Sequence, residues 1–395
     1  MSDYRFDSIY QPVEGCVVSY KPFYEPLLFN ELNARCKGMK LSNRADSSAV
    51  FVVQDYVSVL EEIEKEGFVF LQHIHPYQCS APVNGTEADM QQYFDVLETL
   101  LPYLTEEDRL TCQCRIDTGI PFSYSNQDLT KGLSEYLTVK GFRVEPASAD
   151  TAVSLTVYKD VAYLGISRLS HNVSDWTGGI LFYSSDGVIC RAEFKIEEAF
   201  KVFGIEVKDG MTALDLGAAP GGWTHFLSRQ GVSVDAVDPA NLEDEVKKAK
   251  NVKHYKMLAQ EFVREYKDKR YDIIVNDMKM DSNESIDILC EMSSQLKPDG
   301  CCLLTLKLPK SNIQKRINIA KQVLGRRFET VQVRQLYFNR SEVTVFMKKL
   351  KENVASMHGG QLVMFFLLRN CVNWKYHTQI LLFSNLSLIF TMHIF

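Results

Sequence analysis

The sequence lacks several patterns that would assign a function directly. Its ten cysteines are scattered and form no Cys-x-x-Cys pair, which argues against zinc and disulfides and for reduced thiols in a cytoplasmic protein. It contains no Gly-x-Gly-x-x-Gly and no Gly-Lys-Ser/Thr sequence, so a dinucleotide-binding fingerprint and a P-loop are disfavoured. Residues 1–7 have neither a basic start nor an apolar core, so no secretory signal is expected.

Basic residues are nearly absent from one part of the chain and abundant in another. Residues 51–100 hold only Lys65 against nine carboxylates, whereas residues 307–349 hold eleven Lys and Arg against Glu329 and Glu342. The net charge of −6 therefore conceals a region that offers phosphates a positive surface, although solvated helix faces are the alternative. The candidates for phosphate contacts are Lys310, Lys315, Arg316, Arg326, Arg327, Arg334 and Arg340.

A chain of 395 residues is too long for one ordinary core, so several domains are expected. We predict an α+β module at 1–105, a second module at 106–185, a third domain at 186–350 and an atypical hydrophobic extension at 351–395. The first module has strand-like segments at 13–20, 49–53 and 68–73 and helix-like segments at 22–36 and 57–66. His73 and His75 lack accompanying ligands and are interpreted as a strand-end pair, not a metal site.

Charged residues are also missing from residues 376–395, so a membrane anchor has to be considered. Polar residues such as His377, Gln379 and Asn385 interrupt that stretch, however, and clean membrane-spanning segments rarely carry so many. We therefore expect an extension of unassigned role, and membrane association is disfavoured.

A glycine-rich segment follows the apolar run at 211–216. It reads Asp215-Leu-Gly-Ala-Ala-Pro-Gly-Gly-Trp-Thr224 and leads into a helix-like sequence. A strand that ends at glycines before a helix brings a ligand close to bare backbone and to the N-terminal amides of the helix. Asp238 follows Asp215 by 23 residues and ends an alternating strand, the spacing expected of an acid on ribose hydroxyls. The alternative interpretation is a structural turn between strand and helix.

From residue 191 onward, helix-like and strand-like segments alternate. Strands are expected at 211–216, 234–238, 252–257, 271–278 and 301–308, helices at 191–200, 285–296 and 312–325, and a terminal antiparallel pair at 331–338 and 342–347. The alternation predicts an α/β fold with a doubly wound, largely parallel sheet. Ligands of such sheets lie beyond the carboxyl ends of the strands.

Four ionisable residues fall where these elements begin or end. They are Lys195, Asp277, Lys307 and Glu342. A lysine at the end of an apolar strand is unfavourable without partners, which the two carboxylates would provide. Burial lowers the pKa of a lysine and carboxylates raise it, so a balance would let one lysine accept a proton near neutral pH. Singly, each residue is an ordinary surface charge or salt bridge; jointly they favour catalysis.

These residues carry a family resemblance. The segment from Asp215 to Thr224 resembles the S-adenosylmethionine loop of FtsJ-type ribose 2′-O-methyltransferases, in which Pro-Gly-Gly before an aromatic residue is distinctive. The four ionisable residues match the Lys-Asp-Lys-Glu tetrad of that family in order and context. Leu306-Lys-Leu-Pro309, the stretch 334–345, Lys195-Ile-Glu-Glu-Ala-Phe200 and the loop 172–179 are similar to its RlmM branch.

The resemblance implies a Rossmann-like class I methyltransferase sheet, preceded by THUMP-like or ferredoxin-like RNA-binding modules. It implies 2′-O-methylation of a ribose in large-subunit (23S-type) ribosomal RNA, with S-adenosylmethionine as cofactor, RNA or a pre-ribosomal particle as partner, and no metal. Catalysis would fall to Lys195, Asp277, Glu342 and, as general base, Lys307. The cofactor-binding residues would be Asp215, Gly217, Ala218, Ala219, Pro220, Gly221, Gly222, Trp223, Asp238, Gln260 and Asp277.

Two other functions are compatible with the same fold. One is 2′-O-methylation of transfer RNA or capped messenger RNA, against which the RlmM-like segments argue. The other is a non-catalytic RNA-binding or ribosome-assembly protein that keeps a cofactor pocket. An intact tetrad argues against it, since a binding module has no use for a lysine at the end of an apolar strand.

Overall fold

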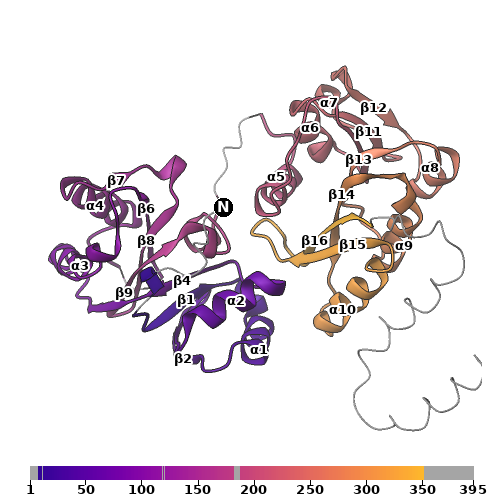
Figure 1. The fold of residues 1–395 in the computed structure, drawn as a ribbon. Helices are drawn as coiled ribbons and strands as arrows, with labels where there is room; N and C mark the ends of the chain where they lie inside the picture. Colours follow the sequence, from indigo (N-terminus) through magenta and orange to yellow (C-terminus); the bar gives the residue numbers. More distant parts are fainter. Residues whose placement is uncertain (1–7, 11, 118, 120, 182–186, 351–395) are drawn as a thin grey trace, which may run out of the picture. The chain divides into compact units, whose positions relative to one another are not determined.

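The computed structural model describes residues 8–10, 12–117, 119, 121–181 and 187–350 (Figure 1). The extension predicted at 351–395 lies outside these residues. Within them, no helix is both long and apolar enough to cross a membrane. The nine cysteines in the described part of the chain are free thiols.

The first sheet has four antiparallel strands in the order β2-β3-β1-β4. Its elements are β1 (Gly15–Ser19), η2 (Pro22–Tyr24), α1 (Glu25–Arg35), β2 (Lys40–Arg44), β3 (Ser48–Val52), α2 (Tyr56–Glu66) and β4 (His73–Tyr77). Alternate residues of β1, Cys16 and Val18, pack in one core with Leu28, Leu32 and Leu60 of the helices, as the two-residue period of a strand requires. The first predicted module is therefore an α+β unit.

The second sheet has five strands in the order β5-β9-β8-β6-β7. Its elements are β5 (Cys79–Pro82), α3 (Asp89–Glu98), β6 (Arg109–Ile116), α4 (Asn126–Val139), β7 (Arg143–Val144), β8 (Thr151–Tyr158) and β9 (Val161–Arg168). Strands β8 and β9 form an antiparallel hairpin. The boundary predicted at residue 105 falls within this unit, because β5 pairs with β9.

His73 and His75 both lie in β4 and are buried. His73 Nδ1 is 3.0 Å from Ser174 Oγ, and His75 Nε2 is 2.9 Å from Thr156 Oγ1. Burial lowers the pKa of His73 to about 3 and that of His75 to about 4, so both imidazoles are neutral near pH 7. Their partners are protein hydroxyls, as a structural pair requires.

The third sheet has seven strands in the order β12-β11-β10-β13-β14-β16-β15. The first five are parallel, and β16 is antiparallel to both of its neighbours. Its strands are β10 (Thr212–Leu216), β11 (Ser233–Val237), β12 (Val252–Tyr255), β13 (Tyr271–Asn276), β14 (Leu296–Lys307), β15 (Phe328–Arg334) and β16 (Glu342–Lys349). The doubly wound α/β sheet predicted for this region is confirmed.

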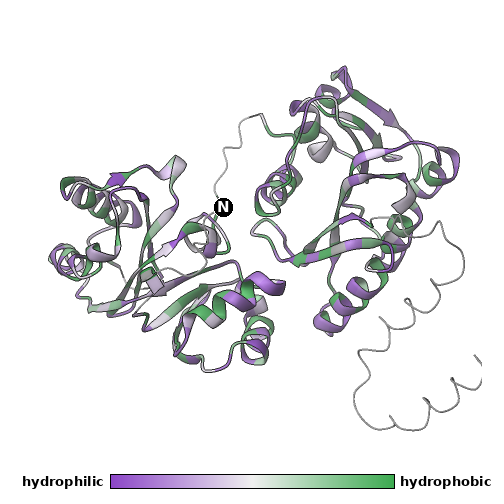
Figure 2. Cartoon of the chain, in the orientation of Figure 1, coloured by the Kyte–Doolittle hydropathy of each residue, from purple (hydrophilic) through white to green (hydrophobic). Residues whose placement is uncertain are grey.

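Helices cover both faces of the third sheet. They are α5 (Ala192–Val202), α6 (Gly222–Arg229), α7 (Asp244–Lys248), α8 (Ala259–Glu265), α9 (Ser282–Met292) and α10 (Ile313–Leu324). Ala213 and Ile273 belong to the core shared with α5 and α6, whereas Leu214 and Ile274 belong to the core shared with α8, α9 and α10. Apolar residues gather along these strands, and the flanking helices are hydrophilic on their outer sides (Figure 2).

Two apolar segments predicted as strands are irregular. Strand β4 begins at His73, so residues 68–72 precede it, and β15 ends at Arg334, so residues 335–338 follow it. In both segments, two consecutive backbone N–H groups donate to a carboxylate. Glu31 accepts from Val69 N and Phe70 N at 3.3 Å each. Glu198 accepts from the amides of residues 337 and 338 at 2.6 and 2.9 Å.

Candidate active site

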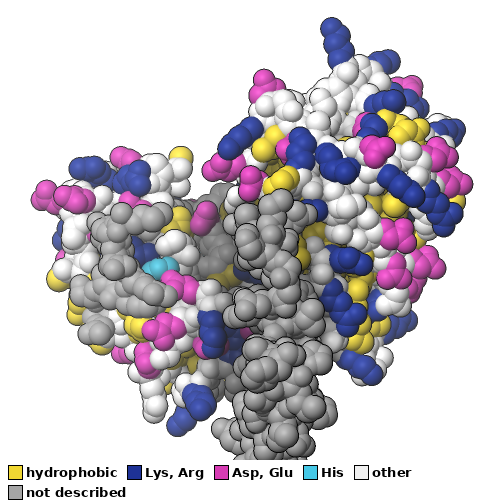
Figure 3. All heavy atoms as spheres, turned by 45° about the vertical axis from the view of Figure 1, so that its right-hand side comes forward, with side chains coloured by type: hydrophobic (Ala, Val, Ile, Leu, Met, Phe, Trp, Pro, Cys, Tyr) yellow, Lys and Arg dark blue, Asp and Glu magenta, His cyan; other side chains and the backbone are white. Residues whose placement is uncertain are grey.

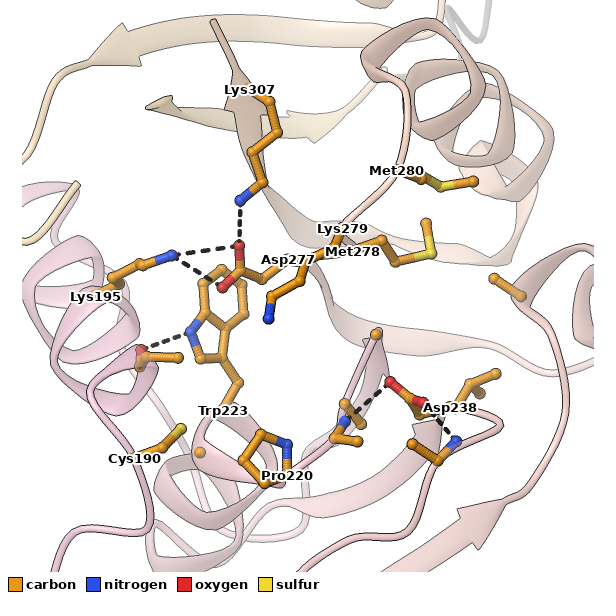
Figure 4. Close-up of a pocket in the computed structure, with 18 of the residues that line it drawn as sticks. Cys190, Lys195, Pro220, Trp223, Asp238, Asp277, Met278, Lys279, Met280 and Lys307 are labelled. Carbon is orange, nitrogen blue, oxygen red and sulfur yellow. Dashed lines mark hydrogen bonds and ion pairs between the residues drawn. The ribbon is translucent and has the colours of Figure 1, made fainter. Parts of the chain in front are cut away.

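The glycine-rich segment connects β10 to α6 at the carboxyl end of the third sheet (Figure 4). Gly217 and Gly221 have φ angles of +76° and +120°, a region that favours glycine. A Cβ at Gly217 would lie 2.8 Å from Met278 Cγ, and one at Gly221 would lie 2.8 Å from Val246 Cγ2. The sequence predicted that these glycines make room for a ligand, but the neighbours that exclude a side chain here are protein atoms.

Asp215 lies beneath this segment and is 1% exposed. Its Oδ2 accepts a hydrogen bond from Thr224 Oγ1 at 2.6 Å, which ties β10 to the first turn of α6. Burial, with the nearby carboxylates of Asp277 and Asp238, raises the pKa of Asp215 to about 7, although the bond from Thr224 opposes the shift. Asp215 was predicted to bind the cofactor; it is not among the residues that line the cavity, and its carboxylate supports the loop through Thr224.

Because its folded-state pKa is raised, Asp215 makes the protein less stable as the pH rises from about 4 to about 7. Asparagine carries no charge at any pH and avoids this loss. We therefore expect the melting temperature of Asp215→Asn, relative to wild type, to rise by roughly 2–5 °C between pH 5 and pH 8. The melting temperatures of variant and wild type are measured at each pH by thermal unfolding, with circular dichroism as the signal. The exposed Asp268→Asn is the control, and a constant difference between Asp215→Asn and wild type would contradict the assignment.

Lys195, Asp277, Lys307 and Glu342 converge on one point and form a closed ring of alternating charges. Lys195 Nζ lies 3.0 Å from Asp277 Oδ2 and 2.6 Å from Glu342 Oε1. Lys307 Nζ lies 2.8 Å from Asp277 Oδ1 and 2.6 Å from Glu342 Oε2. Figure 4 shows the two lysines reaching Asp277 from two directions. Lys307 is the most accessible of the four, with 30% of its side chain exposed.

The sheet register explains why these side chains meet. Lys307 and Glu342 are directly opposite each other in the antiparallel pair of β14 and β16. Thr305 precedes Lys307 by two residues and so shares its face of the strand. Its hydroxyl donates to Asp277 Oδ1 and accepts from Lys307 Nζ at 3.2 Å. Sequence reasoning missed Thr305, although its alternation with Lys307 was a usable signal.

The ring stabilises the charged form of its members. Burial raises the pKa values of Asp277 and Glu342, but the two ammonium groups outweigh burial and hold both pKa values below the usual range. Burial lowers the pKa of Lys307, but Asp277 and Glu342 outweigh it and leave that pKa raised. The sequence-based expectation that one lysine is often neutral near neutral pH is therefore not met for Lys307, which is an ammonium ion at pH 7.

A cavity of about 850 Å³ lies between the glycine-rich segment and the ring. The predicted residues that line it are Lys195, Gly217, Ala218, Ala219, Pro220, Gly222, Trp223, Asp238, Gln260, Asp277, Lys307 and Glu342. Gly221, like Asp215, was predicted to bind the cofactor but is not among the lining residues. Its φ of +120° and its contact with Val246 give it a role in the shape of the loop.

Two of the lining residues hold the walls of the cavity in place. Asp238 accepts from Ala219 N at 3.1 Å through Oδ2 and from Ala240 N at 2.7 Å through Oδ1. Trp223 is buried, and its indole N–H donates to Ala192 O at 2.7 Å at the start of α5. Trp223 therefore anchors the helix that carries Lys195.

The structure adds lining residues that sequence reasoning did not find. They are Cys190, Arg191, Ala192, Val237, Pro239, Ala240, Leu258, Met278, Lys279, Met280, Phe338 and Ser341. Leu258, Met278 and Met280 are apolar and line the same cavity as Gln260. Most of these residues lie in loops just after strands, where no periodic pattern marks them.

The basic residues predicted to contact phosphates have different surroundings. Lys310, Lys315, Arg326, Arg327 and Arg340 are exposed, and Arg340 lines the cavity. Arg334 instead donates to Leu71 O at 2.9 Å, and burial lowers its pKa to about 10, so it is a structural residue. Figure 3 shows Lys and Arg side chains over the visible face of the molecule, with Asp and Glu between them.

Comparison with known proteins defines the class of the third domain. Residues 188–351 match the FtsJ-like methyltransferase family, so this region is an FtsJ-like methyltransferase domain. The chain is 32% identical over 203 residues to the ribosomal RNA large subunit methyltransferase M of Tolumonas auensis, covering 47% of this chain and 53% of that protein. It is 35% identical over 175 residues to the protein of the same name from Laribacter hongkongensis, covering 40% and 47%.

These matches confirm the resemblance to FtsJ-type enzymes of the RlmM branch that was predicted from the sequence. The chain spans about half the length of the curated relatives it matches. Among solved structures, it is similar to TrmN from Thermus thermophilus, with 12% identity and a TM-score of 0.34 over 85% of this chain and all of that one.

Proposed function

We propose that this protein transfers a methyl group from S-adenosylmethionine to the 2′-hydroxyl of a ribose in RNA, and that the RNA is large-subunit ribosomal RNA. The observation that carries the proposal is the closed ring of two lysines and two carboxylates beside the cavity. A hydroxyl group at this ring would meet both proton acceptors and cations. The names of the relatives support ribosomal RNA as the substrate class.

The cavity fits S-adenosylmethionine on the chemistry of its lining. Asp238 follows β11 and has acceptor capacity beyond its two backbone bonds, which suits the ribose diol of the cofactor. The apolar side chains of Leu258, Met278 and Met280 suit a planar base, and Gln260, which lines the same cavity, would bond its polar edge. The loop 217–222 would hold the methionine part. When bound, the cofactor supplies an electrophilic methyl group on a cationic sulfur.

The ring residues prepare the acceptor oxygen. Lys307, as the neutral amine, would take the proton of the 2′-hydroxyl and become an ammonium ion as the oxygen bonds the methyl carbon. The bond between that carbon and the sulfur of the cofactor would break in the same step, and S-adenosylhomocysteine would leave as a neutral thioether. Asp277 and Glu342 hold Lys307 in place, and Lys195 balances their charge. Because charge is dispersed in methyl transfer, positioning contributes more than a strong oxyanion site would.

Alkaline hydrolysis tests the position of the methyl group. Wild-type protein is incubated with labelled S-adenosylmethionine in three separate reactions. Each reaction contains one class of transcript: large-subunit ribosomal RNA, transfer RNA or capped RNA. A 2′-O-methyl group removes the nucleophile of alkaline cleavage, so one bond of the labelled RNA should resist hydrolysis. Label that resides on a base, with every bond still cleaved, contradicts the proposal. Label in no RNA class supports the non-catalytic alternative.

Asp238 provides a test of cofactor binding that does not depend on activity. Asp238→Asn removes the charge that would accept the ribose hydroxyls, and a hydrogen bond to a charged group contributes about 1.5–3 kcal/mol. We expect the affinity for S-adenosylmethionine, measured by calorimetry, to fall by roughly 10- to 100-fold. Asp244→Asn, an exposed carboxylate on α7, is the matched control. Unchanged affinity in Asp238→Asn would place the ribose elsewhere.

A further inference from the structure

The segment 335–341 joins β15 to β16 and delivers Glu342 to the ring. Three of its residues, Phe338, Arg340 and Ser341, line the cavity. The segment is not a strand, yet Gln335 is 1% exposed and Asn339 is fully buried. Its conformation therefore depends on bonds from other parts of the chain, and these bonds bear directly on where Glu342 lies.

One set of bonds comes from the first α+β module, outside the methyltransferase domain. Lys21 Nζ donates to the carbonyl of Asn339, and Tyr24 OH donates to the carbonyl of Arg340 at 3.1 Å. At the start of the segment, Gln335 N donates to the carbonyl of residue 69 at 2.7 Å. The side chain of Gln335 accepts from that of residue 72 at 3.2 Å. The module thus contacts both ends of the segment.

The opposite side of the segment is held from within the methyltransferase domain. Glu198 accepts from the amides of residues 337 and 338, and it lies on α5 three residues after Lys195, on nearly the same helix face. Ser341 O accepts from Leu308 N at 2.9 Å, directly after Lys307. Asn339 Oδ1 accepts from residues 336 and 344 at 2.8 and 3.1 Å. A shift of the segment would therefore move Glu342 relative to both lysines of the ring.

We propose that Lys21 and Tyr24 are positioning residues of the active site, which hold the carbonyls of Asn339 and Arg340 so that Glu342 bonds both lysines at once. The effect on methyl transfer rests on the proposed function; the effect on the segment does not. The first module is then a structural part of the catalytic site, in addition to any part it has in binding RNA.

The surroundings of Lys21 fit this role. Tyr24 is 2% exposed and Lys21 is half-buried, so neither bond is replaced by water without loss. Burial lowers the pKa of Lys21 to about 8, although the carboxylates of Glu198 and Glu342 counteract it. An ammonium group in this place is stabilised by the same two carboxylates that order the segment and the ring.

Two substitutions with matched controls test the proposal. Tyr24→Phe removes only the hydroxyl, and Lys21→Met removes the ammonium but keeps most of the side-chain volume. The controls are Tyr136→Phe, which loses a hydroxyl bond from α4 to Glu98 of α3, and Lys37→Met, which replaces an exposed lysine of the first module. Lys21→Arg keeps a cationic donor. Three quantities are measured: the single-turnover rate of methyl transfer, the affinity for S-adenosylmethionine, and hydrogen–deuterium exchange of the peptide 335–342.

We expect the single-turnover rate at saturating RNA to fall about tenfold in Lys21→Met and about threefold in Tyr24→Phe. The affinity for S-adenosylmethionine should stay within about twofold, because neither residue lines the cavity. Exchange of the peptide 335–342 should accelerate several-fold in both variants. Lys21→Arg should recover most of the rate, and both controls should behave as wild type.

The outcomes separate the two proposals. If exchange accelerates but wild-type protein methylates no RNA, the proposed function fails, while the hold on the segment stands. Unchanged exchange, or accelerated exchange with an unchanged rate, overturns the positioning role. If Lys21→Met does not fold, Tyr24→Phe decides, since it removes a single oxygen atom. A loss of rate that is matched by an equal loss of cofactor affinity also overturns the proposal, because it indicates general loosening.

Discussion

Replacement of Lys307 by methionine is expected to reduce the single-turnover rate of methyl transfer by about a thousandfold, within the range that general-base catalysis contributes. Lys307 is the most accessible member of the ring and contacts both carboxylates, at 2.8 and 2.6 Å. Methionine has nearly the same length and cannot accept a proton at this site. Since the cofactor would be held mainly by the loop and by Asp238, the affinity for S-adenosylmethionine should stay within several-fold.

The matched control is Lys348→Met. Lys348 is an exposed lysine on β16, at the end of the same sheet that is remote from the ring. The Lys348→Met protein should methylate RNA at the wild-type rate. A Lys307→Met protein that binds the cofactor and methylates normally would contradict the assignment of the base. A protein that loses cofactor binding in parallel with activity would instead place Lys307 in the binding site.

The rate of methyl transfer by the wild-type protein is expected to rise with pH. A base must be neutral to accept a proton, and Asp277 and Glu342 raise the pKa of Lys307, so only a small fraction of the amine is available at pH 7. The single-turnover rate should increase about tenfold per pH unit through neutrality and level off only beyond the ordinary pKa of a lysine side chain, about 10.4. Glu342→Gln removes one of the two charges that raise this pKa, so the midpoint of the profile should move down by about one unit or more.

The rate at the plateau reports how well the ring positions the neutral Lys307, whereas the midpoint of the profile reports the pKa of Lys307. The plateau should also fall in Glu342→Gln, because glutamine holds the two lysines less firmly than a carboxylate does. Glu329→Gln, an exposed acid on β15, should leave both unchanged. A wild-type rate that is flat from pH 6 to pH 9, or a midpoint that does not move in Glu342→Gln, would exclude Lys307 as the titrating base.

The sequence predicted the third sheet and the ring because both follow from local patterns. Apolar runs that end in Asp277 and Lys307 mark two adjacent parallel strands, and the carboxyl ends of such strands meet at one edge. Glu342 opens the next strand in the sheet, directly opposite Lys307. The positions of three of the four side chains are thus determined by strand order alone.

Other features depend on contacts that no local pattern encodes. Residues 68–72 and 335–338 have the composition of strands, but Glu31 and Glu198 satisfy their amides. A carboxylate that is buried by the fold is indistinguishable in the sequence from one on a solvated helix. A buried arginine is likewise indistinguishable in the sequence from an exposed one. Arg334 was therefore predicted to contact a phosphate, although it donates to Leu71 O of the first module.

The pKa of Lys307 is a further case. Burial and the two carboxylates have opposite effects on it, and only the distances in the ring determine which is larger. Sequence order placed these groups together but could not set those distances. The expected pH profile therefore follows from the distances between these side chains and not from their order in the sequence.

The central claim is that the acceptor is a ribose oxygen, and an RNA that lacks this one oxygen tests it most directly. Once the methylated nucleotide has been mapped, the same RNA is prepared with a 2′-deoxynucleotide at that position and incubated with wild-type protein and labelled S-adenosylmethionine. The account predicts that the deoxy RNA gains no label, while the all-ribose RNA is methylated. Label transferred to the deoxy RNA at the same rate would show that the methyl group goes to another atom, and would contradict the account.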